Sequence, residues 1–431
     1  MSSELNMFML TQIRGGVNLG GRIKRVKIGV FSDYYLDQAD GTAIAVEISR
    51  AGLTAAGHEV HVFCPRLPGT PRTKRVVSFY SLPALIYANL RACWPFSRRT
   101  LARIEALDLD VIHIHTPFLV GLAGLRAARK LGKPVVMTAH LDLDFMDGYF
   151  VALMAMPFLA MLIGVICRQP GEFLKAIFEP RWRPASGWRR DVAWRTYAFL
   201  SRQCDLVLTP SQKIATQLNR YYPADNMKTV PNGVGLPPRL PSKQIARREL
   251  GLSEDEFIVI NSGRHVREKR VEIIIKAFAR TVAEAPSSRL VLLGAGPKDG
   301  VLKALAQELH IEDKVDFMGA IPRSEVFVYL AAGDIFVNAC LREVASLAIL
   351  EAASVGRPLI LFDERLIEPL EPGSNGFFVK SVRGLSNKMS WFSKNPAEMK
   401  TFGDASVKRV RLKFSVQNHI KWLTEAYRQV L

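Results

Sequence analysis

Short runs of apolar residues recur along the first half of the chain, and stretches with helical spacing separate them. VKIGVFS, at residues 26–32, is the first such run, and HEVHVFCP, DVIHIHT and KPVVMTAH follow it. The stretch GLAGLRAARKLG between the last two has the spacing of a helix closed by Gly132. Continuous apolar strands that alternate with helices are typical of a parallel sheet covered on both faces. We therefore predict a doubly wound α/β domain.

The pattern resumes after a proline-rich segment, LPPRLPSK, which we interpret as the linker between two domains. A second series of apolar runs follows it: EFIVINSG, SRLVLLGAG, KVDFMGA, DIFVNAC and RPLILFD. We predict a first domain at 1–235, a linker at 236–245, a second domain at 246–415 and a terminal helix at 416–431 that packs back on the first domain. Two such halves place the carboxyl ends of both sheets around a central cleft, where a shared ligand can bind.

Length and composition agree with two globular domains. The chain has 431 residues, enough for two full hydrophobic cores. Its net charge of +18 indicates attraction to an anionic partner, such as nucleotide phosphates, an acidic membrane or nucleic acid. The five cysteines are widely spaced and form no CxxC pair, which disfavours zinc and disulfides and favours a reducing cytoplasm. The opening MSSELNMFMLTQIRGG lacks the pattern of a secretory signal, so we expect none.

Two carboxylates, Glu343 and Glu351, bracket the start of a helix predicted from about Ser346 to Val355. A carboxylate in the preceding loop can accept hydrogen bonds from sugar hydroxyls, and one on the helix can hold a ribose diol. The free N–H groups at the helix N-terminus favour phosphate. Two solvated acids are the alternative for an isolated pair.

A basic cluster, GRHVREKR at residues 263–270, follows the predicted strand IVINSG directly. Arginine and lysine at the carboxyl end of a strand can neutralise the charge that builds on a departing diphosphate. A solvated helix start is the alternative.

Together these motifs resemble glycosyltransferase family 4, which has the GT-B fold. The resemblance covers most of the chain and includes, in the family's order and spacing, DVIHIHTPF, VPNGV, GRHVREKRVEIIIKAF, LVLLGAGP and EVASLAILEAASVGRP. It implies an α/β fold of two Rossmann-like doubly wound domains that face a central cleft, the second of which binds a nucleotide sugar. Within the family, the opening loop and DVIHIHTPF look most like the diacylglycerol glucosyltransferases and the phosphatidylinositol mannosyltransferases.

The resemblance also implies roles for residues of the second domain, motif by motif. Arg264 and Lys269 would bind the donor diphosphate, Glu343 would contact the transferred sugar, and Glu351 would hold the ribose. Ile321, after FMGA, would lie near the base.

Two residues of the first domain match the family as well. His140 matches a histidine that reaches the reacting sugar, and a core or capping histidine is the alternative. Gly41 matches a glycine whose missing Cβ lets the backbone approach the donor phosphates, and a plain turn is the alternative.

The chain departs from the family inside the carboxylate motif. Ala345 and Ser346 stand where an aromatic residue and a glycine are common, and Val344 replaces a small hydroxyl residue. The identity of the donor sugar therefore stays open.

Family membership implies retention of the anomeric configuration without a protein nucleophile, through attack in which the leaving phosphate helps to take the acceptor proton. No metal and no other cofactor is then required. Asp142 and Asp144 spell an Asp-x-Asp, but its metal-binding version belongs to a different glycosyltransferase fold, and we interpret it here as a polar loop.

An uncharged apolar segment, residues 149–167, reaches the length of a membrane span. Because both flanks must supply strands to one sheet, we expect it to lie in the bilayer interface, and we assign a membrane-associating insertion to about 149–202. Arginines and tryptophans follow it, including Trp182, Trp188 and Trp194, as is typical where anionic headgroups meet an apolar boundary. A buried helix beside a basic solvated surface is the alternative.

The sequence thus predicts a cytoplasmic hexosyltransferase, peripheral or monotopic on the cytoplasmic face of a membrane. Its partners would be a UDP- or GDP-hexose and an anionic lipid surface, with diacylglycerol or a lipid headgroup as acceptor. Nucleic acid is not expected, and the oligomeric state stays open. The alternatives are the same chemistry on a soluble or polysaccharide acceptor, and a catalytically silent membrane-bound relative.

Overall fold

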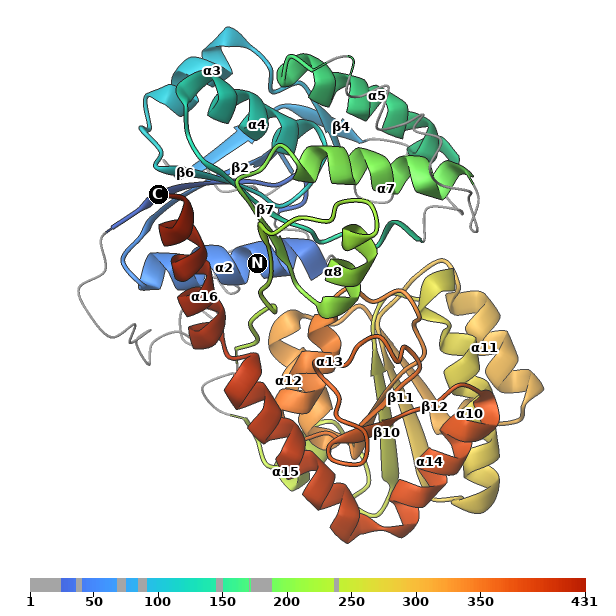
Figure 1. Cartoon of the computed structure of the whole chain (residues 1–431). Helices are drawn as coiled ribbons and strands as arrows, with labels where there is room; N and C mark the ends of the chain where they lie inside the picture. Colours follow the sequence, from blue (N-terminus) through green and yellow to red (C-terminus); the bar gives the residue numbers. More distant parts are fainter. Residues whose placement is uncertain are drawn as a thin grey trace. The chain divides into compact units, whose positions relative to one another are not determined.

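The computed structural model describes residues 25–35, 41–67, 75–83, 91–144, 150–169, 171, 188–235 and 240–431. These residues form two compact units (Figure 1). Unit 1 holds the described residues up to Gly233 together with Val416–Leu431, and unit 2 holds those of Val234–Ser415.

A parallel sheet forms the centre of unit 1. Its strands lie in the order β3-β2-β1-β6-β7-β8-β9. Their bounds are β1 Lys27–Phe31, β2 Glu59–Pro65, β3 Val76–Phe79, β6 Val111–Ile114, β7 Val135–Thr138, β8 Leu206–Thr209 and β9 Met227–Thr229. Every residue of β6, β7 and β8 is buried, as expected for strands covered on both faces. The strand order reverses between β1 and β6, which pair in parallel.

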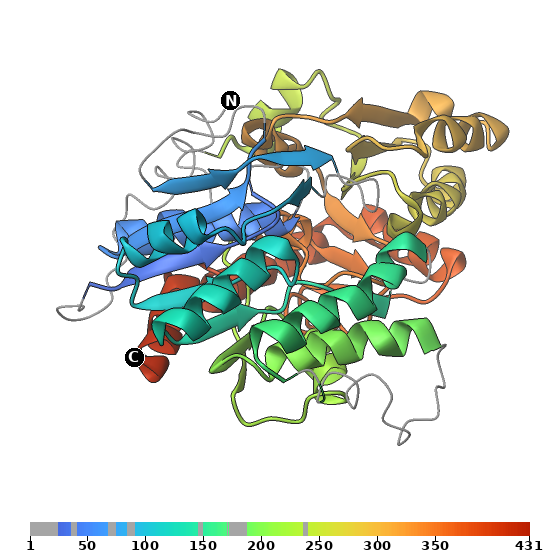
Figure 2. The same ribbon diagram turned by 90° about the horizontal axis from the view of Figure 1, so that it is seen from above.

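Helices cover both faces of this sheet. They are α2 Gly41–Ala55, α3 Arg98–Glu105, α4 Leu119–Leu131, α5 Phe150–Ile166, α7 Trp188–Ser201, α8 Gln212–Asn219 and α16 Val416–Val430. Helices α2 and α16 pack together on one face, while α4, α5 and α7 lie on the other (Figures 1 and 2). Strands β4 Ser81–Pro83 and β5 Arg91–Cys93 pair antiparallel in a separate two-stranded sheet. Within the described residues, no helix has both the length and the apolar character that crossing a bilayer needs.

The terminal helix α16 belongs to unit 1 through specific contacts. Tyr427 Oη lies 2.8 Å from His113 Nδ1, and His419 Nε2 lies 2.9 Å from Ser49 Oγ on α2. Ile420 packs where a Cβ on Gly52 would come within 2.5 Å of its side chain, so α2 needs a glycine at this crossing. These contacts give the chain after Ser415 a fixed place on the first sheet.

Unit 2 repeats the architecture around a parallel sheet with the order β12-β11-β10-β13-β14-β15. Its strands are β10 Phe257–Ser262, β11 Ser288–Leu293, β12 Val315–Gly319, β13 Ile335–Asn338, β14 Leu359–Leu361 and β15 Gly376–Phe378. Its helices are α9 Lys243–Glu249, α10 Val271–Glu284, α11 Asp299–Glu308, α12 Arg323–Ala332, α13 Leu347–Ser354, α14 Val382–Lys394 and α15 Pro396–Lys413, with short 3-10 turns at η2 Arg267–Lys269 and η3 Glu312–Lys314. The strand order reverses between β10 and β13.

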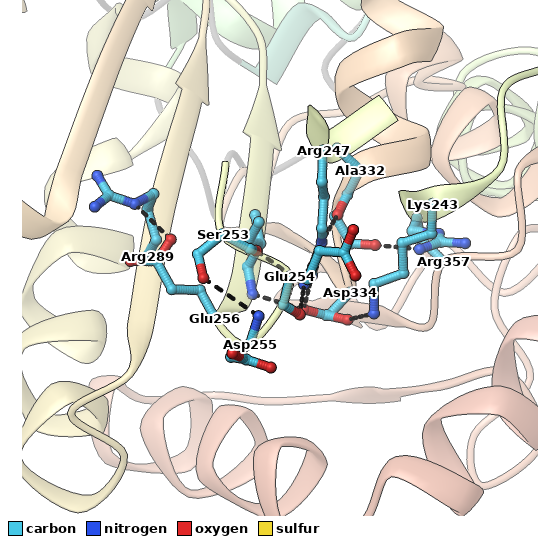
Figure 3. A network of polar contacts seen from close by, with 12 residues as sticks. Lys243, Arg247, Ser253, Glu254, Asp255, Glu256, Arg289, Ala332, Asp334 and Arg357 are labelled. Carbon is cyan, nitrogen blue, oxygen red and sulfur yellow. Dashed lines mark hydrogen bonds and ion pairs between the residues drawn. The ribbon is translucent and has the colours of Figure 1, made fainter. Parts of the chain in front are cut away.

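A buried carboxylate ties the first helix of unit 2 to its sheet. Asp334, directly before β13, accepts hydrogen bonds from the backbone N–H of Ile258 and from Arg247 Nη2, each at 2.7 Å (Figure 3). Lys243 forms an ion pair with the same carboxylate. Helix α9 begins at Lys243, so residues 243–245 belong to this helix and not, as the sequence had predicted, to the linker. Residues 236–239 lie outside the described residues.

Candidate active site

A lysine and a glutamate meet where the strand order of unit 2 reverses. Lys269 ends the turn η2 after β10, and Glu343 lies in the loop between β13 and α13. Lys269 Nζ is 2.6 Å from Glu343 Oε1, and Asn338 Nδ2 donates to the same oxygen at 3.2 Å. In doubly wound sheets, ligands bind outside the carboxyl ends of the strands at this reversal. The pair therefore lies where a ligand of unit 2 is expected.

The pair is charged and only partly covered. Glu343 is buried, while about a quarter of the Lys269 side chain is exposed. Burial opposes the charge on Lys269, but the Glu343 carboxylate outweighs it and raises the pKa of Lys269 above its usual range. The half-buried Arg264 acts on the same pKa in the lowering direction, so its positive charge lies within reach of Lys269. Two cations and one carboxylate thus gather at the end of β10.

Two loops approach each other closely beside this pair. A Cβ on Gly294, after β11, would lie 1.9 Å from the carbonyl oxygen of Gly263, and Gly294 has a φ of 138°. A Cβ on Gly296 would lie 2.4 Å from the carbonyl oxygen of His265. Glycine at both positions is therefore required by the packing of the loops after β10 and β11.

The second carboxylate of the motif is also buried and paired. Glu351, on α13, forms an ion pair with Arg323, the first residue of α12. Burial raises the pKa of Glu351, and Arg323 opposes that rise. Ile321, the residue predicted near the base, is half-buried two positions before Arg323. Glu351 is thus paired with an arginine that the sequence analysis did not single out and that follows Ile321 by two residues.

The histidine predicted in unit 1 lies in a buried row of three. His140 follows β7, and its Nε2 is 3.0 Å from Nδ1 of His115, which follows β6. The rings of His113 and His115 are 4.0 Å apart between centroids. Burial lowers the pKa of His140 to about 3, so its imidazole is neutral at physiological pH. A neutral ring offers one donor and one acceptor nitrogen.

Gly41 is the first residue of α2 and is exposed. A Cβ at this position would meet no atom within 4 Å, so contacts within the described residues do not require glycine. The residues just before it, 36–40, lie outside the described residues. The predicted role of Gly41 at the donor phosphates remains a prediction.

The Asp-x-Asp segment lies in the connection after β7, as predicted, and both of its carboxylates are paired within unit 1. Asp142 forms a 2.9 Å ion pair with Lys213 of α8, and both side chains are essentially inaccessible to solvent. Asp144 accepts hydrogen bonds from Trp194 Nε1 at 2.9 Å and from Gln217 Nε2 at 2.7 Å. The two carboxylates thus fasten the segment after His140 to α7 and α8. Within the described chain, no three His, Cys, Asp or Glu side chains gather as a metal site.

The apolar segment after this loop forms α5, one side of which is buried. Met156, Leu159 and Ile163 are buried on α5, which packs against α4 and α7. An apolar stripe remains exposed on the helix: Phe158 at 52%, Met161 at 43% and Val165 at 63%. Trp194 is buried on α7, so it cannot face lipid headgroups as predicted. Trp182 lies outside the described residues, as does the side chain of Trp188.

Three residues at these sites were missed by the sequence analysis. Asn338, which holds Glu343, was signalled by a polar residue at the end of the apolar strand DIFVNAC. Arg323 had a weaker signal, a basic residue at a helix start where the helix dipole disfavours it. His115 lies in the segment DVIHIHT, but nothing in its spacing distinguished it from a core residue.

The doubly wound units and the charged pair at the reversal of the second sheet define a protein of the GT-B class. The family model Glycosyltransferase Family 4 matches residues 40–236, and the model Glycosyl transferases group 1 matches residues 242–409. Together they span most of both units. The chain belongs to glycosyltransferase family 4 and is an enzyme of the glycosyltransferase class.

The chain is similar over most of its length to two enzymes from different bacteria that carry the same name. Alpha-monoglucosyldiacylglycerol synthase of Acholeplasma laidlawii is 26% identical, with 86% of this chain and 89% of the relative covered. The enzyme of that name from Streptococcus pneumoniae is 27% identical, with 78% and 70% covered.

Among solved structures, HepE of Anabaena in complex with UDP and glucose matches with a TM-score of 0.67 at 18% identity. The match covers 93% of this chain and 99% of HepE. This likeness confirms the predicted fold class.

Proposed function

We propose that this glycosyltransferase moves a hexose from a UDP- or GDP-sugar to a lipid acceptor, such as diacylglycerol or a lipid headgroup, at the cytoplasmic face of a membrane. The transfer retains the anomeric configuration. The observation that carries the proposal is the Lys269–Glu343 pair at the strand-order reversal of unit 2, with Arg264 beside it. The names of the two diacylglycerol enzymes and the UDP and glucose bound in HepE support a lipid acceptor and a nucleotide-sugar donor.

Unit 2 supplies the groups that the donor needs. The Lys269 ammonium has three N–H donors, so it can keep one on Glu343 and give the others to a diphosphate. Arg264 adds a second positive charge there. Because the bond between the sugar and the phosphate breaks with build-up of negative charge on the phosphate, these cations stabilise the transition state more than the bound donor.

Glu343 serves the sugar side of the same bond. Lys269 and Asn338 both point at its Oε1, which fixes the carboxylate in one orientation. The carboxylate then accepts hydrogen bonds from sugar hydroxyls and stabilises the positive character of the sugar as the bond breaks. The acceptor oxygen forms its bond to the sugar on the face that the phosphate leaves, and the acceptor proton passes to a phosphate oxygen. In this scheme the two cations do the work of a metal, and none is required.

Two features of unit 1, His140 and the surface of α5, also support the proposal. As a neutral ring held by His115, His140 offers a hydrogen bond to the reacting sugar without adding charge. The exposed stripe of Phe158, Met161 and Val165 on α5 suits contact with the apolar boundary of a bilayer, where a lipid acceptor is found.

The proposal is tested with purified protein, UDP-glucose or GDP-mannose, and diacylglycerol in anionic vesicles. We expect one donor to give a chloroform-soluble glycolipid whose new linkage has the anomeric configuration of the donor by NMR, and we expect the rate to persist in EDTA. Transfer to water-soluble glycans alone would replace the lipid acceptor by a soluble one. If the protein neither transfers nor hydrolyses the sugar of any nucleotide sugar, it is a silent relative, and the proposal is contradicted.

A further inference from the structure

Arg323 stands beside the carboxylate that we assign to the donor ribose. It is the first residue of α12, which packs against α13, and its Nη2 donates to Glu351 Oε1. The Arg323 side chain is 11% exposed and the Glu351 side chain 4%. The pair is therefore almost fully removed from water.

Two features argue that Arg323 is not there to stabilise its own helix. A positive charge at a helix N-terminus is disfavoured by the helix dipole. In addition, Arg323 Nε is buried and has no hydrogen-bond partner among the described residues. A buried guanidinium with an unpaired N–H is costly, so its place next to Glu351 needs another explanation.

The chemistry of Glu351 supplies that explanation. A ribose presents two hydroxyl donors, and an ionised carboxylate can accept both, whereas a protonated one carries a donor of its own. Burial favours the protonated form and raises the pKa of Glu351. Across the described elements packed on α13, Arg323 is the charged side chain that opposes this rise.

We propose that Arg323 is a positioning residue that keeps Glu351 a carboxylate and turns it toward the ribose hydroxyls, which makes Arg323 a determinant of ribose recognition. The inference rests on the proposed function, because it needs a nucleotide donor in unit 2. It adds a residue that acts through Glu351 rather than on the transferred sugar.

The test compares the Kd of UDP with that of 2′,3′-dideoxy-UDP by calorimetry, using the guanosine pair if the protein prefers GDP. The ratio of the two Kd values isolates the ribose hydroxyls, because titration of the phosphates affects both nucleotides equally. The ratio is measured for the wild type, Arg323→Met, Arg323→Lys and Glu351→Gln, at about pH 7 and about pH 9. Arg280→Met, at an exposed arginine of α10, is the matched control.

We expect the wild type and the control to favour UDP by about tenfold or more at both pH values, the size of a hydrogen bond to a charged group. Glu351→Gln loses this preference at both. Arg323→Met loses it near pH 7, because the pKa of Glu351 rises further without the arginine, and regains part of it near pH 9 as the carboxylate ionises. Arg323→Lys keeps most of the preference, since the positive charge remains.

The proposal is overturned if the ratio of the two Kd values for Arg323→Met equals that of the wild type at both pH values. This includes the case in which the substitution weakens the binding of both nucleotides by one common factor, as a purely structural role would. If Arg323→Met does not fold, Arg323→Gln takes its place with the same expectation. A wild type that binds UDP but ignores the ribose hydroxyls ends this inference alone, whereas one that binds neither UDP nor GDP ends the proposed function as well.

Discussion

At the scale of single residues, Lys269 is the group proposed to bind the donor diphosphate and to stabilise its charge in the transition state. Its ammonium is held 2.6 Å from Glu343 and keeps its charge despite partial burial. Replacing Lys269 by methionine preserves much of the side-chain volume and removes the charge. Because the ammonium meets phosphate in the bound donor and more charge in the transition state, we expect weaker UDP binding by about tenfold or more and a loss of about 100- to 1,000-fold in turnover.

Calorimetry with UDP and steady-state kinetics measure the two effects. Lys276→Met, at an exposed lysine of α10, is the control and leaves both unchanged. Unchanged donor affinity in Lys269→Met would remove this lysine from the diphosphate site.

At the scale of elements, α5 presents its apolar stripe to solvent while its other side is core. Leu159 and Leu162 lie on the same helix, but Leu159 is buried and Leu162 is half-buried, so changing either would disturb the packing of unit 1. Changing Phe158, Met161 and Val165 to serine removes exposed apolar surface and spares the core. If the stripe enters the bilayer interface, each side chain contributes about 1–2 kcal/mol to membrane binding, and we expect the variant to leave anionic vesicles in a flotation assay.

The variant's melting temperature reports whether the fold survives, and Val301→Ser, at an exposed valine of α11, is the control. A folded triple variant that still floats fully with the vesicles would show that α5 is not the membrane contact. Leu159→Asp is expected to unfold unit 1 instead, because it buries an unpaired charge.

The buried Asp334 gives a second prediction at this scale. Lys243 and Arg247 form ion pairs with its carboxylate, and Arg357 lies near it (Figure 3). Burial lowers the pKa of Arg357 to about 10. Removing the carboxylate leaves buried positive charge uncompensated. We expect Asp334→Asn to lower the free energy of unfolding by about 3–5 kcal/mol, measured by urea titration.

The matched control for Asp334 is Asp316→Asn on β12. Its carboxylate is 3.0 Å from Arg289 but about a third exposed, so we expect a change of about 1 kcal/mol or less. Equal effects of the two substitutions would contradict an anchoring role for Asp334.

Regular elements were predictable from the chain, because their signals are local. The stretch closed by Gly132 forms α4 Leu119–Leu131, and Gly132 adopts the left-handed conformation that ends it. The carboxylate motif likewise places α13 within a residue of its predicted start. Contacts between residues far apart in the sequence were not predictable. The sequence around Asp142 does not indicate its ion pair with Lys213 of α8, and the sequence around Trp194 does not indicate that this side chain of α7 is buried. Both depend on tertiary packing, which spacing along the chain does not report.

At the scale of the whole molecule, buried neutral histidines link stability to pH. Burial lowers the pKa of His113 and His140 to about 3 and that of His419 to about 4, all in unit 1. Their unfolded pKa is near 6.5, so below that pH the unfolded chain takes up protons that the folded chain refuses. Stability is therefore lost as the pH falls from 6.5, by about 1.4 kcal/mol per pH unit for each such histidine.

Asp33 opposes this trend, because burial raises its pKa to about 6. Protonation of Asp33 therefore increases the free energy of unfolding as the pH falls, but this one group is outnumbered by the histidines. Urea titrations at several pH values between about 7.5 and 4.5 check the prediction. A variant that replaces His419 by glutamine should show a shallower loss. A free energy of unfolding that stays level from about pH 7 to pH 5 would show that these histidines become protonated in the folded protein.

The central claim is that Glu343 serves the transfer of a sugar from a nucleotide to a lipid. The most direct measurement is the initial rate at which labelled sugar moves from the preferred donor into chloroform-soluble product, compared between the wild type and Glu343→Gln at matched UDP occupancy. Glutamine keeps the shape of the side chain and removes the charge that Lys269 and Asn338 hold in place. We predict that UDP affinity changes by no more than a few-fold while the rate falls by about 100- to 1,000-fold. A Glu343→Gln variant that transfers sugar at the wild-type rate would contradict the account.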